Sequence, residues 1–196
     1  TSIKDIKDNS NVSSAHSTET GKMKTIATFG IQVNGAPGGI LSNANDMSKW
    51  VLMQLNKGKY GDKLDKQLFK AARQREMWSI YTVMNNNPSA RYNSHFSGYG
   101  LGWFLQDTKG NLSVSHSGGL PGMISYVSMI PDLKLGIVIL TNTANGGGAL
   151  YTAVNNPVTD AYLGLDKIDY VKMYAGYLKL SENSGDSITA KVWKTV

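Results

Sequence analysis

The stretch LSVSHSGGLPGMISYVSMIPDLKLGIVILTN, residues 112–142, decides the fold of this 196-residue chain. Three apolar-rich segments lie in it, at 112–116, 124–130 and 134–140, and turn-forming residues separate them. Consecutive strands that are joined by short turns pair antiparallel, because parallel neighbours need a long crossover connection. We therefore expect these three segments to form an antiparallel sheet.

A further strand is expected before this stretch. Leu101, Trp103 and Leu105 alternate with other residues, and this period of two predicts one strand over residues 99–105. Residues 107–111 have the composition of a tight connection, so the strands on either side should form a hairpin.

Helical patterns lie on both sides of the predicted strands. Asn43 and Asp46 have the spacing of a capping box, and an apolar helical face follows them as far as Gly58. The order of helices, then consecutive strands, then helices predicts an α+β fold in which helices flank an antiparallel sheet. Further helices are predicted at about 62–78, 149–163 and 168–178.

Composition excludes several classes of protein and site. The chain has no Cys and only three His. A disulfide framework, a Cys-ligated metal and a thiol nucleophile are therefore excluded, and we expect neither a metal nor another cofactor. The longest aliphatic run, residues 135–140, is too short to cross a bilayer, which needs about 20 residues.

The net charge of +6 comes mainly from a basic stretch at residues 57–75. One interpretation is a module that binds a polyanion, and another is a solvated, lysine-rich helix face. No aromatic residues are interleaved at base-stacking spacing and no known nucleic-acid motif occurs, so a nucleic-acid partner is not expected.

The strongest candidate for chemistry is His116-Ser117-Gly118-Gly119, at the end of a predicted strand. The two glycines let a ligand approach the backbone closely, and a strand edge can pair with an extended, peptide-like substrate. A backbone N–H there can donate to a developing oxyanion. The same tetrapeptide also fits an ordinary strand that ends in a turn. Gly-x-Ser-x-Gly, Ser-x-x-Lys, Tyr-x-Asn and the phosphate-binding Gly-x-x-x-x-Gly-Lys do not occur in the chain.

Three blocks in order give this tetrapeptide a context. Together they resemble the serine β-lactamase-like family, which holds class C β-lactamases, D-Ala-D-Ala carboxypeptidases and related esterases. The resemblance runs over about residues 30–165. The blocks are Gly35–Ser42 with Asn45-Asp46-Met47 and Trp50, then Tyr99–Trp103, then His116–Gly122, closed by Ile130-Pro131-Asp132, Leu135-Gly136 and Leu140-Thr141-Asn142.

The resemblance implies roles for the tetrapeptide. His116-Ser117-Gly118 matches the family's third active-site element, so His116 and Ser117 would contact the substrate or tune the field around the nucleophile, with Gly118 beside them. Gly119 would give its backbone N–H to the oxyanion hole. Ser117 also has to be considered as a nucleophile, but adjacent residues on a strand point to opposite faces, which argues against its activation by His116.

The family's first two elements, Ser-x-x-Lys and Tyr-x-Asn, normally lie upstream of these blocks. The resemblance therefore implies the C-terminal part of a hydrolase that acts through an acyl-enzyme on β-lactam, D-alanyl peptide or ester substrates, and this chain alone should be inactive. The alternatives are an esterase without a cell-wall role and a non-catalytic binding or interaction module that keeps the fold.

We expect three regions along the chain: a connector from a missing N-terminal part at 1–34, the C-terminal portion of the β-lactamase-like domain at 35–165, and a terminal helix with a linker or tail at 166–196. The expected partners are a small-molecule or peptide substrate, and either the missing N-terminal part or a second copy in a swapped or self-paired dimer. Family members are usually exported, so the parent protein should be periplasmic, on the cell surface or secreted.

Other conspicuous residues have simpler interpretations. His16 and His95 lie in polar segments and should be surface residues, although His16 would line the site if its loop folds over it. Three tryptophans are expected to anchor the core, namely Trp50, Trp78 and Trp103.

Overall fold

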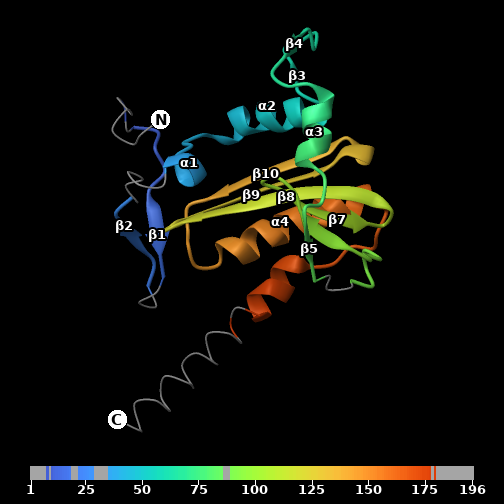
Figure 1. The fold of residues 1–196 in the computed structure, drawn as a ribbon. Coiled ribbons are helices and arrows are strands. Elements are labelled where there is room, and N and C mark those ends of the chain that lie inside the picture. The colour runs from blue at the N-terminus through green and yellow to red at the C-terminus, as the bar shows by residue number, and fades with distance from the viewer. Residues whose placement is uncertain are drawn as a thin grey trace.

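The computed structural model describes residues 8, 10–18, 22–28, 35–85, 89–177 and 179. Its centre is a six-stranded sheet in the order β10-β9-β8-β7-β6-β5, and all neighbouring strands are antiparallel (Figure 1). The predicted α+β class is therefore confirmed. The strands are β5 (Thr82–Met84), β6 (Ser97–Tyr99), β7 (Phe104–Thr108), β8 (Asn111–Leu120), β9 (Met123–Ile130) and β10 (Leu135–Thr141).

The three strands predicted from residues 112–142 are the longest in the sheet. β8 and β9 form a hairpin that ends with Leu120 opposite Met123. A 3-10 turn, η2 (Pro131–Leu133), joins β9 to β10, and Lys134 takes the left-handed conformation (φ 51°) that closes this turn.

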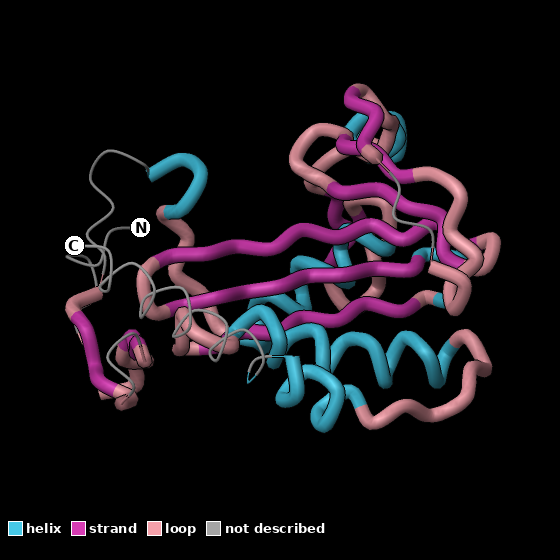
Figure 2. Tube along the Cα trace, turned by 90° about the horizontal axis from the view of Figure 1, so that it is seen from below, coloured by secondary structure: helices cyan, strands magenta, loops and turns pink. Residues whose placement is uncertain are grey.

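Helices cover both faces of the sheet, with α2 (Ala44–Leu55) on one and α4 (Gly147–Tyr162) on the other (Figures 1 and 2). Asn43 caps α2, because its side-chain oxygen accepts a hydrogen bond from the backbone N–H of Asp46 at 3.0 Å. The predicted capping pair and both predicted helices are thereby confirmed.

The main apolar core lies between α2 and the sheet. The Trp103 ring stacks on Trp50 with centroids 5.5 Å apart, and Trp78 meets Trp103 edge-on at 6.4 Å. All three tryptophans thus anchor the core, as the sequence predicts. The buried members of this core are Val51, Trp103, Leu105, Val114, Val127 and Met129.

The helix predicted at 62–78 is wrong in its first half. The chain instead forms a hairpin of β3 (Lys59–Tyr60) and β4 (Lys66–Gln67), which projects from the molecule in Figure 1, and only α3 (Ala71–Met77) is helical. Leu64, inside the predicted helix, takes a left-handed conformation with φ 52°, which a continuous right-handed helix does not allow. The basic stretch is therefore mostly a hairpin and not a helix face.

The single strand predicted at 99–105 is also wrong. Tyr99 ends β6 and lies opposite Phe104 at the start of β7, so the chain reverses direction between them. Gly102 makes this turn with φ 82°. Gly100 packs against the backbone of Met77, where no Cβ would fit.

The expected connector at 1–34 carries structure in its described part. β1 (Ala15–Ser17) and β2 (Lys24–Ile26) form a hairpin, and a short helix, α1 (Gly35–Gly38), precedes α2. The backbone N–H of His16 donates to the carbonyl of Gly122 at 3.3 Å, which docks the hairpin on the β8–β9 turn.

The chain after α4 continues into a helical segment at 170–177, in agreement with the predicted helix at 168–178. The predicted linker or tail, from residue 180 onward, lies outside the described residues. In the described part of the chain, no helix combines the length and the apolar character that a membrane crossing requires.

Candidate active site

The candidate site is the last part of β8, where the sheet leaves one side of the strand open. β7 accompanies β8 only as far as the pair Phe104–Ser115, whereas β9 continues to Leu120. Within the described chain, residues 116–120 therefore have a strand partner on the β9 side alone. Ser117, Gly118 and Gly119 are exposed. This edge can offer backbone N–H and C=O groups to an extended ligand.

Gly118 and Gly119 leave this edge without side-chain bulk. A Cβ on Gly118 would lie 2.6 Å from the hydroxyl of Ser125 on β9, so only glycine fits without displacement. Gly119 is less restricted, because its Cβ would meet Ile124 at an ordinary 3.4 Å. Both glycines thus leave space in front of the backbone, and a side chain at position 118 would also require the Ser125 hydroxyl to move.

His116 is held at both ring nitrogens. Its Nδ1 lies 2.6 Å from the carbonyl oxygen of Ser117, and its Nε2 lies 2.8 Å from the hydroxyl of Tyr99. A carbonyl oxygen can only accept, so Nδ1 carries the proton and donates. In the neutral ring Nε2 is then the acceptor, and the Tyr99 hydroxyl donates to it.

Aromatic rings complete the surroundings of His116. The Phe104 ring stacks on the imidazole, with centroids 5.3 Å apart and an angle of 25° between the planes. Tyr99 meets Phe104 edge-on at 4.9 Å. The orientation of the imidazole is thus set by two hydrogen bonds and a stacking contact.

The geometry of His116 argues against Ser117 as a nucleophile. His116 contacts Ser117 through the carbonyl oxygen of Ser117 and not through its hydroxyl. A serine needs an adjacent base to attack at neutral pH, and both nitrogens of the nearest imidazole already have other partners. The arrangement therefore suits a binding surface better than a Ser–His pair.

The other two histidines lie elsewhere. His16 docks beside the β8–β9 turn, and its Nδ1 lies 3.1 Å from the carbonyl oxygen of Asn142. His95 contacts the carboxylate of Asp107 at 3.0 Å, and its side chain is 66% exposed, which agrees with the predicted surface position.

Two carboxylates outside the site have structural partners. Burial alone would raise the pKa of Asp107, but hydrogen bonds from the backbone of Phe96 and His95 and from the His95 ring outweigh it and lower that pKa. Arg91 binds Asp160 at 2.7 Å, so its charge is used inside the fold. In the described part of the chain, no cluster of three or more His, Cys, Asp or Glu could hold a metal ion.

Sequence reasoning finds the tetrapeptide but misses Tyr99 and Phe104. The block Tyr99–Trp103 is visible in the sequence, yet interpreting it as one strand hides its approach to His116. The turn at residues 100–103 brings both aromatic rings next to β8. The glycines at 100 and 102 are the signal that could have revealed this turn.

The structure thus combines an antiparallel sheet, helices on both of its faces and a His-Ser-Gly-Gly strand edge. A family model described as Beta-lactamase matches residues 7–156. The chain belongs to this family of β-lactamase-fold hydrolases.

Individual relatives agree with this assignment. The unguisins hydrolase ungD′ of Aspergillus campestris is 28% identical over 151 residues, which are 73% of this chain and 25% of the relative. The unguisins hydrolase ungD of Aspergillus violaceofuscus is 34% identical over 82 residues, or 39% of this chain and 14% of the relative. The chain thus spans about a quarter or less of the length of these curated relatives.

A solved structure shows the same fold. It is the octameric penicillin-binding protein homologue from Pyrococcus abyssi, with a TM-score of 0.64 and 20% sequence identity. The match covers 84% of this chain and 33% of that one.

Proposed function

We propose that this chain is the C-terminal part of a serine hydrolase that works through an acyl-enzyme, and that it supplies one wall of the substrate site. The observation that carries the proposal is the open edge of β8 at residues 116–120, with its exposed Ser117, Gly118 and Gly119. Substrates of this edge are β-lactams, D-alanyl peptides or esters, which all present an acyl group that a nucleophile can attack.

Each residue of the edge has a role in this proposal. The backbone N–H of Gly119 donates to the oxyanion that develops on the attacked carbonyl. The exposed hydroxyl of Ser117 binds a polar group of the substrate, and the Tyr99–His116 pair shapes the field beside it. Gly118 keeps the surface free of side-chain bulk.

The nucleophile and its base come from polypeptide outside this chain. The chain contains no Ser-x-x-Lys and no Tyr-x-Asn, and it matches only 25% and 33% of two longer relatives. The partner is the N-terminal part of the same protein, or a second copy in a swapped or self-paired dimer. We propose a periplasmic, cell-surface or secreted location for the assembled protein.

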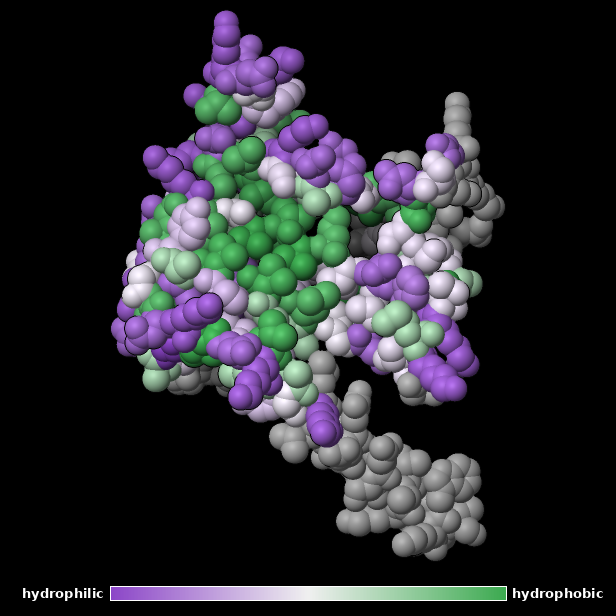
Figure 3. All heavy atoms as spheres, turned by 180° about the vertical axis from the view of Figure 1, so that it is seen from behind, coloured by the Kyte–Doolittle hydropathy of each residue, from purple (hydrophilic) through white to green (hydrophobic). Residues whose placement is uncertain are grey.

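Exposed apolar surface supports such a partner. β10 has a neighbour only on its β9 side in the described sheet, and Figure 3 shows a continuous hydrophobic area on the back of the molecule. Large apolar side chains are exposed on the elements next to that edge, namely Leu52 of α2, Leu140 of β10, and Leu150, Val154 and Val158 of α4.

The proposal is tested by intact-protein mass spectrometry after incubation with a reactive penicillin and, separately, with a fluorophosphonate. The 21.3 kDa chain should stay unmodified, and a co-purifying or co-expressed N-terminal chain should carry the adduct. An adduct on the 196-residue chain itself would contradict the proposed division of the site, and Ser117 would then be the first position to map.

A pair of glycine variants tests whether the β8 edge takes part. Gly119→Val adds bulk at the edge with little internal strain, and it should slow acylation of the assembled protein at least about tenfold. Gly148→Ala on α4 is the matched control, because its nearest neighbour would be 3.9 Å from the new Cβ. Equal acylation rates for the two variants would exclude the edge as a substrate wall.

A further inference from the structure

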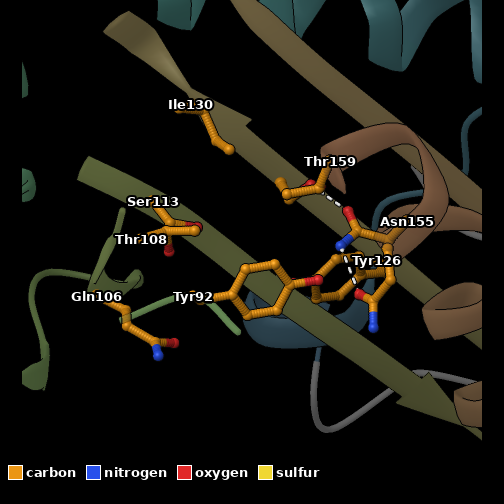
Figure 4. A pocket seen from close by; sticks show the side chains of 10 residues that line it. Tyr92, Gln106, Thr108, Ser113, Tyr126, Ile130, Asn155 and Thr159 are labelled. Atoms are coloured by element: carbon orange, nitrogen blue, oxygen red, sulfur yellow. Dashed lines mark hydrogen bonds between the residues drawn. The ribbon is translucent and has the colours of Figure 1, made fainter. Parts of the chain in front are cut away.

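A cavity of about 130 Å³ lies on the other side of the sheet from the main core, between the sheet and α4 (Figure 4). Three strands, one helix and the Tyr92 loop contribute to its wall. The residues lining it are Tyr92, Gln106, Thr108, Ser113, Tyr126, Ser128, Ile130, Asn155, Asn156 and Thr159.

The wall is polar where a helix covers a sheet, although such interfaces are normally apolar. Ile130 is the one aliphatic residue of the lining. Three lining side chains are polar and more than nine-tenths buried: Thr108 (6% exposed), Ser128 (7%) and Thr159 (8%).

β8 and β9 carry apolar side chains on the face toward α2 and polar side chains on the face toward the cavity. Val114 and Met129 face the α2 side and belong to the apolar core, whereas their neighbours Ser113 and Ser128 line the cavity. Because side chains alternate along a strand, this pattern separates an apolar face from a hydroxyl-bearing one. Folding alone would favour apolar residues on both covered faces, so the hydroxyls point to a ligand.

The hydrogen-bonding groups of the cavity are neutral and of both kinds. Ser128 donates to the Asn155 side chain at 2.6 Å, and the Asn155 amide donates to Asn156 at 3.3 Å. Figure 4 marks these hydrogen bonds of Asn155 with dashed lines. Amide and hydroxyl groups can each donate and accept. Gln106, Asn155 and Asn156 are only half-buried, so solvent reaches the site.

No lining residue carries a formal charge. The nearest carboxylate partner is Asp160, which accepts from the Tyr92 hydroxyl at 2.9 Å and is already neutralised by Arg91 at 2.7 Å. A charged ligand would therefore lose its hydration without gaining an opposite charge, whereas a neutral ligand with several hydroxyls could replace its water contacts.

We propose that this cavity binds a small neutral polyol, either free or as the hydroxyl-bearing end of a larger sugar. A volume of about 130 Å³ has room for several water molecules, so a molecule as small as glycerol fits. The site is independent of the β8 edge, and so it does not depend on the acyl-transfer proposal.

The test is a titration of the ¹⁵N-labelled full chain, in the assembly state that it adopts in solution, followed by amide chemical shifts. Glycerol and methyl glucoside are the polyol probes, and acetate and ethylammonium are charged probes of small size. Glycerol should give saturable shifts, in the millimolar range, at amides around Thr108, Ser113 and Asn155. Methyl glucoside distinguishes a free polyol from the end of a larger sugar, because its binding requires room for a sugar ring at the cavity mouth.

Variants locate the binding. Ser113→Leu fills the cavity, and Thr108→Val removes one buried hydroxyl at nearly constant volume. Both should weaken glycerol binding, Ser113→Leu at least about tenfold. Thr82→Val on β5 is the matched control, because Thr82 is exposed and does not line the cavity.

Each outcome of the titration either supports or overturns the proposed polyol site. Saturable glycerol shifts that survive Thr82→Val and disappear with Ser113→Leu support the site, with or without methyl glucoside binding. The proposal is overturned if neither polyol gives saturable shifts, which means a cavity that holds water only. It is also overturned if acetate or ethylammonium binds equally well, or if Ser113→Leu leaves glycerol binding unchanged.

Discussion

At the scale of single residues, the carbonyl oxygen of Ser117 sets the tautomer of His116, and the Tyr99 hydroxyl helps to hold the orientation of the ring. The carbonyl oxygen of Ser117 requires the proton on Nδ1, and the tyrosine hydroxyl then occupies the lone pair of Nε2. The imidazole therefore presents neither a free proton nor a free lone pair to a ligand. Tyr99 is therefore a positioning residue for the His116 ring.

Removal of that hydroxyl is predicted to change the histidine and little else. In Tyr99→Phe, Nε2 loses its donor, while the ring stacking with Phe104 is retained. A long-range ¹H–¹⁵N correlation spectrum should show the Nδ1–H tautomer for neutral His116 in the parent chain, with the Nε2 resonance moving toward the position of an unbonded imine nitrogen in the variant.

His16 and His95 provide internal controls for that spectrum, since neither has a hydrogen bond to Tyr99. Their signals should be unchanged in the variant. Observation of the Nε2–H tautomer for His116 in the parent chain would contradict the hydrogen-bond assignment.

A second residue-scale prediction concerns Gly136, which interrupts the aliphatic run of β10. α2 packs so closely there that a Cβ on Gly136 would overlap Val51 and press on Leu55 at 3.2 Å. Gly136→Ala should lower the free energy of unfolding by about 1–3 kcal/mol, the usual cost of an overpacked core. Urea unfolding measures this, with Gly148→Ala as the control, and equal stability of the two variants would show that α2 lies farther from β10.

At the scale of elements, one polar network ties three segments together. Asp160 of α4 accepts hydrogen bonds from Arg91 at 2.7 Å, from Tyr92 at 2.9 Å and from Tyr170 at 2.7 Å. Arg91 also donates to the carbonyl oxygen of Asp166. The loop at 89–95, α4 and the helical segment at 170–177 are thus held by a single carboxylate.

The pKa of Asp160 gives this network a pH dependence. Burial would raise that pKa, but the hydrogen bonds from Arg91, Tyr170 and Tyr92 outweigh burial and lower it. A depressed pKa in the folded state stabilises the fold above the ordinary Asp pKa of about 4, and this stabilisation is lost as the pH falls through the depressed value.

Asp160→Asn should therefore destabilise the chain at pH 7 by about 2–4 kcal/mol, because it leaves the Arg91 charge without its partner. The difference from the parent chain should shrink as the pH falls toward 3. Thermal unfolding at a series of pH values measures both effects, with the exposed Asp62→Asn as the control. A difference that stays constant from pH 7 to pH 3 would rule out the carboxylate as the source.

How much of each element could be predicted depends on whether its pattern is local. The hydrophobic alternation from 112 to 140 and the Asn43 cap are local signals, and they predict β8, β9, β10 and α2 correctly. Apolar and other residues alternate at 101–105, and this pattern is the same for one continuous strand and for two strands joined by a turn at Gly102. The reversal between β6 and β7 is therefore not predicted. Apolar residues at 62–78 have helical spacing, and the left-handed turn at Leu64 that interrupts the helix leaves no signal in this pattern.

The same distinction applies to the candidate site. The residues of the tetrapeptide are contiguous, so the sequence alone places His116, Ser117, Gly118 and Gly119 at one strand end. The contact between Tyr99 and His116 depends on the register of β6, β7 and β8, which single-sequence patterns do not specify. The polar cavity has no signal in the sequence for a related reason, because its lining comes from three strands, one helix and a loop that only the tertiary fold brings together.

At the scale of the whole molecule, large apolar side chains are exposed on α4 and on the edge strand β10. Leu150, Val154 and Val158 repeat every four residues along α4 and are 48%, 44% and 36% exposed. They form one stripe on the helix, since residues four apart lie on the same face. The open side of β10 lies beside α4, which packs against that strand.

We therefore predict that the isolated chain associates with itself or with co-expressed N-terminal polypeptide. Light scattering coupled to size-exclusion chromatography should report a mass well above 21.3 kDa or a stable two-chain complex. Val154→Lys should weaken this association at least about tenfold, because burial of a valine contributes roughly 1.5 kcal/mol or more. Val83→Lys, at an 85% exposed position on β5, is the control and should leave the association intact.

The opposite result has a definite meaning for the fold. A monodisperse monomer of 21.3 kDa that unfolds cooperatively would show that the stripe on α4 and the open side of β10 are tolerated in water. The α2 core would then suffice for stability, and the proposed partner would be needed only to supply the nucleophile. If instead Val154→Lys and Val83→Lys dissociate the assembly equally, net charge rather than the α4 surface controls association, because both variants add one positive charge.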